Sequence, residues 1–213
     1  MKKVSRRSGK RGLPPGSLVH VGDPGNDRAS IRLFRFSSDR HEELRPADLK
    51  GVGAVPPAGM VMWLDIDGLT SDELLMQTGD LFGLHPLLLE DVLNTDHRPK
   101  VEEYQNELFV VMKMLSLDAE TGGIRTEQIC FVLRQGTVIS FQQRPGDVLD
   151  PIRERIRKDL GRVRRSGADY LLYTLLDVIV DNYFVVVDGG KTLYGVGQDV
   201  GQNETKTFIL SKQ

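Results

Sequence analysis

Apolar and polar side chains alternate along the chain with two different periods. Residues 29–37 alternate apolar side chains with arginines, which is typical of a strand with one half-buried face. Residues 59–67 form a nearly continuous apolar run, which indicates an interior strand. Further strands are predicted at residues 104–118, 126–134 and 137–143, with a hairpin turn at Gln135-Gly136 between the last two.

Helical periodicity predicts two helices that follow strands. In the first, Thr70 is the expected N-cap, Glu73 closes a capping box and Gly83 ends the helix. A second, basic helix is predicted to begin at Asp150-Pro151. Its inward-facing side chains are expected to be Ile152, Ile156 and Leu160.

The segment HPLLLEDVLNTDHRPK, residues 85–100, combines a helix with two adjacent carboxylates. His85 can cap this helix, Pro86 suits its first position, and Pro99 prevents its continuation. Glu90 and Asp91 are neighbours and therefore point about 100° apart on a helix. They cannot easily chelate one ion together, so we expect them to belong to two separate sites.

The most apolar segment, residues 170–187, is predicted to lie in a helix from about Ser166 to Asp188. Each Asp in the middle of a membrane span costs about 2.5 to 3.5 kcal/mol, so we expect a soluble helix largely enclosed by protein. Asp177 and Asp181 share one helix face and should meet solvent, an arginine of residues 153–165 or a cation. An all-oxygen site favours Mg²⁺ over zinc.

Charge separates a basic arm from an acidic body. Residues 1–12 hold six Lys or Arg and no acid, whereas the remainder holds 22 basic and 30 acidic side chains, a net charge of −8. An acidic body suits cations better than nucleic acid, and the arm is expected to be a flexible solvated tail. No signal peptide is readable, so a cytoplasmic location is expected. The single cysteine, Cys130, excludes an internal disulfide and is predicted to be buried.

The motif WLDIDG at residues 63–68 resembles the nucleophile motif of haloacid-dehalogenase-like phosphatases. In that family the first carboxylate, here Asp65, is phosphorylated, and the second, here Asp67, acts as acid and base. Asp147 and Asp150 resemble the later acidic motif of the same family. However, Leu69 stands where that family has Thr, and a strand end followed by a turn and a helix cap explains Thr70 better. A phosphatase is therefore the alternative from another functional class.

Residues 84–104, LHPLLLEDVLNTDHRPKVEEY, resemble the signature segment of the CorA family of magnesium and cobalt transporters. The resemblance extends to RGLPPGSLVHVG, GDVLDPIRERIR and GADYLLYTLLDVIVDNYF, and so covers roughly residues 11–188. It implies an α/β fold, a cytoplasmic α/β/α sandwich with a mixed sheet, which assembles as a homopentamer. It also implies that Mg²⁺ or Co²⁺ binds between subunits as a regulatory ligand, with Glu90, Asp91 and Asp177 as metal ligands.

The resemblance divides the chain into three parts. Residues 1–12 are the basic arm, residues 13–188 the cation-sensing domain, and residues 189–213 an atypical, weakly structured tail in place of the family's stalk helix. The family's membrane helices and Gly-Met-Asn motif do not follow. We therefore expect a sensing domain that is truncated before its membrane part, is not an enzyme and does not transport ions alone. The sister zinc transporters, whose sensor domains share this architecture, remain an alternative.

Overall fold

The computed structural model of the protein describes residues 18–22, 28–117 and 123–194, with side chains as far as residue 187 in the last helix. The basic arm of residues 1–12 lies outside these ranges, as do residues 195–213 of the predicted tail.

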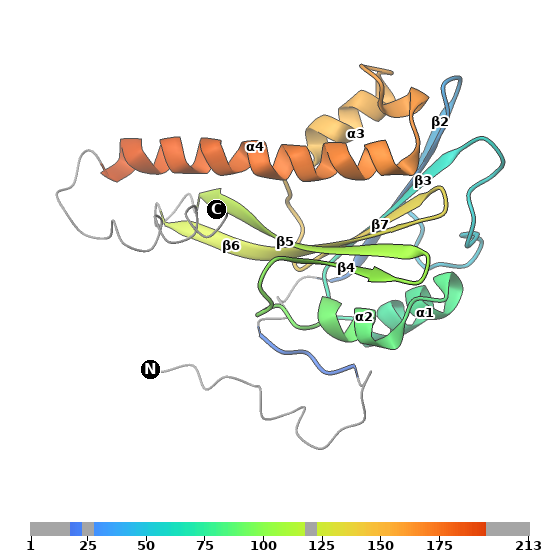
Figure 1. Cartoon of the computed structure of the whole chain (residues 1–213), viewed down its shortest axis with the longest axis horizontal. Helices are drawn as coiled ribbons and strands as arrows, with labels where there is room; N and C mark the ends of the chain where they lie inside the picture. Colours follow the sequence, from blue (N-terminus) through green and yellow to red (C-terminus); the bar gives the residue numbers. More distant parts are fainter. Residues whose placement is uncertain (1–17, 23–27, 118–122, 195–213) are drawn as a thin grey trace.

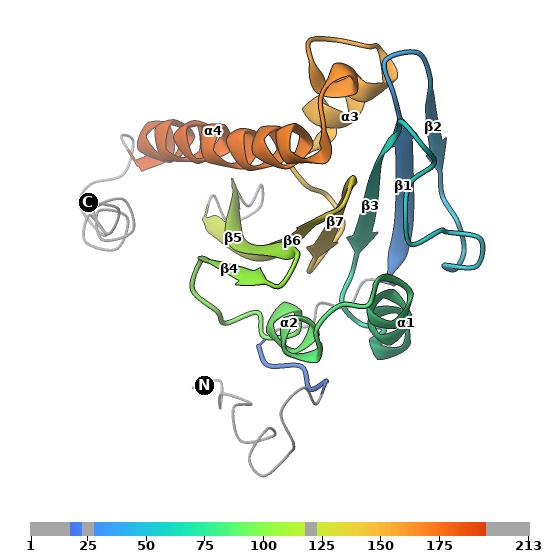
Figure 2. The same cartoon turned by 45° about the vertical axis from the view of Figure 1, so that its right-hand side comes forward.

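The described residues form a seven-stranded mixed sheet in the middle of the molecule (Figures 1 and 2). The strands are β1 (Ser30–Phe36), β2 (His41–Leu44), β3 (Val61–Asp67), β4 (Lys100–Tyr104), β5 (Glu107–Leu117), β6 (Ile124–Arg134) and β7 (Thr137–Gln142). Their spatial order is β2-β1-β3-β7-β6-β5-β4. Within this sheet only β3 and β7 pair in parallel. The carboxyl ends of these two strands therefore meet at the same edge of the sheet.

Helices cover both faces of the sheet, as Figure 2 shows. On one face lie α1 (Asp72–Phe82) and α2 (Pro86–Val92), and on the other lie α3 (Asp150–Arg157) and α4 (Ala168–Tyr194), which a 3-10 turn at Val163–Arg165 connects. Buried apolar side chains form two clusters, one on each face of the sheet. This arrangement is the α/β/α sandwich that the family resemblance implied.

Most predicted strands are confirmed, but two strands of the sheet were not predicted. The strand predicted at residues 104–118 is confirmed as β5, which begins at Glu107; the missed strand β4 lies before it, and the chain turns between the two at Gln105 (φ 47°). Residues other than glycine rarely adopt this left-handed backbone conformation. The sequence around Gln105 therefore did not indicate a turn. The edge strand β2 was not predicted, because its sequence HEEL is largely exposed and lacks apolar alternation. Cys130 is buried, as expected.

The first helix, α1, begins one residue later than predicted. Ser71, not Thr70, is the N-cap, and its Oγ accepts a hydrogen bond from the Leu74 amide at 3.2 Å. With Ser71 as the N-cap, the third helical position is Leu74 and not Glu73, so the predicted capping box is wrong; the side chain of Glu73 accepts a hydrogen bond from Gln77 Nε2 at 3.0 Å. The predicted end is confirmed, since Gly83 adopts the left-handed conformation (φ 66°) that favours glycine.

The two helices after β7 also differ in part from the prediction. Ile152 and Ile156 of α3 are fully buried as expected, but Leu160 lies beyond the helix and is 52% exposed. The last helix, α4, continues past Gly189 as far as Tyr194, so the predicted weak structure is wrong for residues 189–194. Glycine costs about 1 kcal/mol in a helix interior relative to alanine, a penalty that a long helix can absorb.

Between Ala168 and Val187, α4 is long and apolar enough to cross a membrane by length and composition. Its inner side packs against the sheet, and the Asn182 amide donates a hydrogen bond to the Leu115 carbonyl at 2.6 Å. Only 33% of this stretch is buried, however, so the prediction of a largely enclosed helix is wrong for its outer face. The large exposed apolar side chains on that face are Tyr173, Phe184 and Val185.

Candidate functional site

The first two predicted metal ligands lie on α2, whose start is fixed by local contacts. His85 caps the helix as predicted, because its Nδ1 accepts a hydrogen bond from the Leu87 amide at 3.2 Å. Pro86 occupies the first helical position. The apolar side of α2 packs against the sheet, which leaves Glu90 and Asp91 half-buried at its margin.

Asp91 already has two polar partners in its own chain, His97 and the cationic Lys100. Its Oδ1 lies 2.7 Å from His97 Nε2, and its Oδ2 accepts a hydrogen bond from Lys100 Nζ at 2.8 Å. Partial burial opposes the charge of Lys100, but hydrogen bonds to Asp91 and Glu102 raise the pKa of its ammonium group. Lys100 therefore remains charged at neutral pH, and a metal ion at Asp91 has to compete with it.

The third predicted ligand, Asp177, lies on the exposed face of α4. In the described part of the chain, no hydrogen bond or ion pair reaches its carboxylate. Of the alternatives for Asp177, an arginine partner from residues 153–165 is therefore ruled out among the described residues, and exposure to solvent or binding of a cation remains. Several of those arginines pair elsewhere: Arg153 with Asp65, Asp147 and Asp150, Arg157 with Glu43 and Glu154, and Arg165 with Asp159.

The fold does not bring Asp177 together with Glu90 and Asp91. Their helices, α4 and α2, cover opposite faces of the sheet (Figures 1 and 2). One ion therefore cannot be coordinated by both groups within a single chain. A site that combines them requires a second copy.

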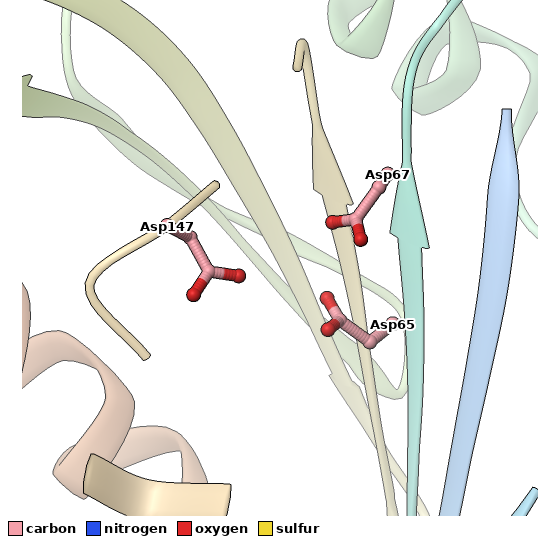
Figure 3. A group of neighbouring side chains, drawn as sticks. All are labelled: Asp65, Asp67 and Asp147. Atoms are coloured by element: carbon pink, nitrogen blue, oxygen red, sulfur yellow. The ribbon is translucent and has the colours of Figure 1, made fainter. Parts of the chain in front are cut away.

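A different set of acids converges inside the protein. Asp65, Asp67 and Asp147 each place one carboxylate oxygen within 4.8 Å of the others, and Figure 3 shows the three side chains grouped together. We call these three residues the buried acid cluster. The parallel pairing of β3 and β7 explains the grouping, because it sets Asp65 opposite Ser140 and Asp67 opposite Gln142. These side chains share the face of the sheet that α3 covers.

Asp65 is hydrogen-bonded through both of its carboxylate oxygens. Its Oδ1 accepts hydrogen bonds from Ser140 Oγ at 2.6 Å and Gln142 Nε2 at 2.9 Å. Its Oδ2 accepts one from Arg153 Nη2 at 2.6 Å. The guanidinium of Arg153 also lies over the ring of Trp63, 5.3 Å from the ring centroid. These contacts fasten α3 to β3.

The other two acids of the cluster have opposite electrostatic environments. Burial opposes the charge of Asp147, but its hydrogen bonds and ion pair with Arg153 hold its pKa below the usual value. For Asp67, burial and then the charges of Asp65 and Asp147 raise the pKa to about 7. Asp67 is 5% exposed, so water compensates little of its charge.

Comparison with known proteins identifies the family. The family described as CorA-like Mg²⁺ transporter protein matches residues 59–192. The chain belongs to the CorA family. The cobalt/magnesium transport protein CorA of Thermotoga maritima is 40% identical over 183 residues, which cover 86% of this chain and 52% of that relative. The magnesium transporter ALR2 of Saccharomyces cerevisiae is 29% identical over 126 residues, which cover 59% of this chain and 14% of that transporter. This member of the CorA family thus spans about half the length of the Thermotoga relative.

Solved structures show the same fold. The soluble domain of CorA from Methanocaldococcus jannaschii matches with a TM-score of 0.57 and 16% identity, covering 84% of this chain and 64% of that one. The ZntB cytoplasmic domain from Vibrio parahaemolyticus matches with a TM-score of 0.57 and 12% identity, covering 85% of this chain and 70% of that one. The fold of this CorA-family chain is therefore shared by proteins of both names.

In this CorA-family chain the buried acid cluster contains three of the four acids of the phosphatase hypothesis, all but Asp150, but in a form unsuited to that chemistry. Asp65, the expected nucleophile, is 0% exposed, and both of its oxygens accept hydrogen bonds. A phosphate ester cannot reach it in this arrangement. The cluster is not an open metal site either, because Gln142 Nε2 lies 2.8 to 2.9 Å from an oxygen of each acid, where an ion would sit.

Proposed function

We propose that this chain is the cytoplasmic cation-sensing domain of a magnesium and cobalt transporter, and that it does not transport ions or act as an enzyme by itself. Family membership and the Thermotoga relative, which is named a cobalt/magnesium transport protein, support this cation class. Mg²⁺ or Co²⁺ is the regulatory ligand, and the ligand residues are Glu90, Asp91 and Asp177. The domain works as a homo-oligomer, a pentamer, with the ions at contacts between copies.

The position of Asp177 is the observation that carries this proposal. Its carboxylate is exposed on the face of the sandwich opposite to α2, without a cation from its own chain in the described residues. It lies between Tyr173 and Phe184, which are 59% and 68% exposed. Exposed apolar side chains around an acid mark a surface for contact with another protein. A second copy that brings its α2 to this surface completes an all-oxygen site for a hard cation.

The ion pair of Asp91 gives the proposed site a built-in competitor. Lys100 Nζ must move away from Asp91 Oδ2 before a divalent cation binds there. Cation binding therefore gains less free energy than it would at an unpaired carboxylate. Such a site empties when the cation concentration falls, which is the behaviour a sensor needs.

Sedimentation velocity of the full chain, with and without Mg²⁺, tests the proposal. We expect Mg²⁺ to shift the wild-type chain toward larger species, because the ion neutralises acids at the contact. Asp177→Asn should abolish the shift. Asp181→Asn is the matched control, since Asp181 is equally an exposed acid one turn further along α4. The proposed site would be wrong if Mg²⁺ did not change the sedimentation of the wild-type chain. It would also be wrong if Mg²⁺ shifted the sedimentation of both variants equally.

A zinc-transporting relative is the second candidate, because the ZntB cytoplasmic domain has the same fold. The proposed ligands are carboxylate oxygens only, and oxygen sites favour Mg²⁺-like hard cations, whereas zinc sites favour nitrogen and sulfur. A competition titration separates the two candidates. The full chain is loaded with Co²⁺, and Mg²⁺ or Zn²⁺ is added. Displacement by micromolar Zn²⁺ but not by millimolar Mg²⁺ would favour the zinc transporter.

A further inference from the structure

The buried acid cluster has fewer hydrogens than its hydrogen bonds require. The Gln142 side-chain nitrogen lies 2.9 Å from Asp65 Oδ1, 2.8 Å from Asp67 Oδ1 and 2.8 Å from Asp147 Oδ2. An amide nitrogen carries two hydrogens, so three acceptors at these distances have to share them. At least one of these close contacts is therefore a weak, bifurcated hydrogen bond or has no hydrogen of the amide between its atoms.

The positive charge in the cluster is also unevenly shared. Arg153 forms ion pairs with both Asp65 and Asp147. Among the described residues Asp67 has no comparable partner, because its one ion pair there is with Arg32 of β1, whose Nη2 lies 3.9 Å from Asp67 Oδ2. Three carboxylates are therefore buried together with one closely paired cation, Arg153. Keeping all three ionised at once costs free energy, because neither water nor enough positive charge stabilises them.

We propose that the carboxyl group of Asp67 is a proton-binding site, which takes up one proton near neutral pH and thereby lets the three acids pack together beneath α3. The proton removes one negative charge, and a protonated carboxyl group no longer requires a full share of the two amide hydrogens, so the proton reduces both deficits described above. Burial and the neighbouring acids raise the pKa of Asp67 to about 7, which agrees with the geometry. The ligand of this site is a proton, and the site is separate from the proposed cation ligands Glu90, Asp91 and Asp177.

Loss of the proton should loosen one part of the fold. Ionised Asp67 repels Asp65 on its own strand and Asp147 in the loop before α3. The strand is held on both sides by its neighbours, whereas the loop is held to the cluster by Arg153 and Gln142. The amide of Leu149, which donates to Asp147 Oδ1 at 2.8 Å, reports on the opening of this loop.

One other carboxyl group near the cluster has a similar titration range. Burial raises the pKa of Glu127 on β6 to about 7, although its side chain accepts a hydrogen bond from the Arg144 amide at 2.8 Å. Asp147 contributes to that rise. Asp150 also pairs with Arg153, but its side chain is exposed. A test of the proposal must therefore resolve Asp67 from Glu127.

Carboxyl ¹³C NMR of the full chain provides this resolution, because aspartate and glutamate resonances are assigned through bonds to their own backbone amides. We expect the Asp67 resonance of the wild-type chain to titrate with a midpoint between pH 6 and 8. Glu127→Gln should leave that midpoint within the same range. A midpoint for Asp67 below pH 5.5 would overturn the proposal. So would a midpoint that Mg²⁺ or Co²⁺ lowers in a saturable manner, because the cluster would then be a metal site.

Hydrogen exchange tests the structural consequence with a different readout. Exchange of the Leu149 amide, corrected for its intrinsic pH dependence, should accelerate at least tenfold between pH 6 and pH 8.5 in the wild-type chain. Asp67→Asn has the same shape without the charge and should remove this acceleration. Equal acceleration in both proteins would show that the proton on Asp67 does not hold the loop.

Discussion

Replacing Asp67 with asparagine should make the protein more stable at alkaline pH. Burial and the charges of Asp65 and Asp147 raise the pKa of Asp67 from 3.8 to about 7 in the folded protein. Between these two values the folded state holds a proton that the unfolded state has released, so stability falls as pH rises through this window. Below pH 3.8 Asp67 is protonated in both the folded and the unfolded state. Above pH 7 the folded protein bears the full free-energy cost of burying an ionised Asp67. Asparagine carries no charge at any pH, so it removes this cost.

The magnitude follows from the shift in pKa. Each pKa unit corresponds to about 1.36 kcal/mol, and the part of the window between pH 5 and pH 7 spans about two units. The free energy of unfolding of Asp67→Asn, minus that of the wild type, should therefore increase by about 3 kcal/mol between pH 5 and pH 8.5. Contributions from Glu127 and from the rest of the chain are common to both proteins and cancel in this difference.

Urea denaturation at both pH values, followed by circular dichroism, measures this difference. Asp80→Asn serves as the control, because Asp80 is an exposed acid on α1, outside the buried acid cluster. Its effect should change by less than about 0.5 kcal/mol over the same range, as is usual for surface substitutions. If the gap between Asp67→Asn and wild type is the same at pH 5 and pH 8.5, the electrostatic account of the cluster is wrong.

Three other substitutions test the remaining contacts. Arg153→Met should lower the free energy of unfolding by about 3 to 5 kcal/mol in urea titrations at pH 7, because it leaves Asp65 and Asp147 buried without their cation; a loss below about 1 kcal/mol would contradict this. Lys100→Met should strengthen Mg²⁺ binding in isothermal titration calorimetry, since the competitor at Asp91 is gone, and unchanged or weaker binding would argue against Asp91 as a ligand. Gly79→Ala should destabilise the protein by about 1 to 3 kcal/mol in thermal unfolding, because the new Cβ lies 2.5 Å from Leu89 Cδ1. Gly53→Ala, whose Cβ meets only ordinary contacts, is its control, and a stabilised Gly79→Ala would refute the argument.

The elements that could be predicted are those whose signals are local. Period-two alternation identified β1, an apolar run identified β3, and a Gly-containing turn identified the hairpin of β6 and β7. The hairpin of β4 and β5 was missed because its turn depends on the left-handed conformation of Gln105, a residue with no strong preference for it. The exposure of the outer face of α4 was not predicted, because an apolar residue in the sequence does not show whether its side chain packs against the sheet or faces solvent.

The candidate sites differ in the same way. The carboxylates Glu90, Asp91 and Asp177 were found through family resemblance, yet the pairing of Asp91 with Lys100 depends on how the chain returns after α2. The buried acid cluster requires the parallel pairing of β3 with β7, two strands about 70 residues apart in sequence. A signal was present, since Asp65, Asp67 and Gln142 are polar residues on inward positions of apolar strands. The sequence did not show that these positions face one another.

The length of α4 has a mechanical consequence. Its 27 residues form a rod about 40 Å long, and hydrogen bonds from Asn182 and Tyr183 to the carbonyls of β5 tie it to the sheet before its last turns. Because these ties hold α4 near Tyr183, a rotation of about 5° about that point would move Tyr194, about 16 Å further along, by about 1.4 Å, given a rise of about 1.5 Å per residue. A rearrangement of β5 where α4 is tied to it is therefore passed along a stiff helix as far as Tyr194.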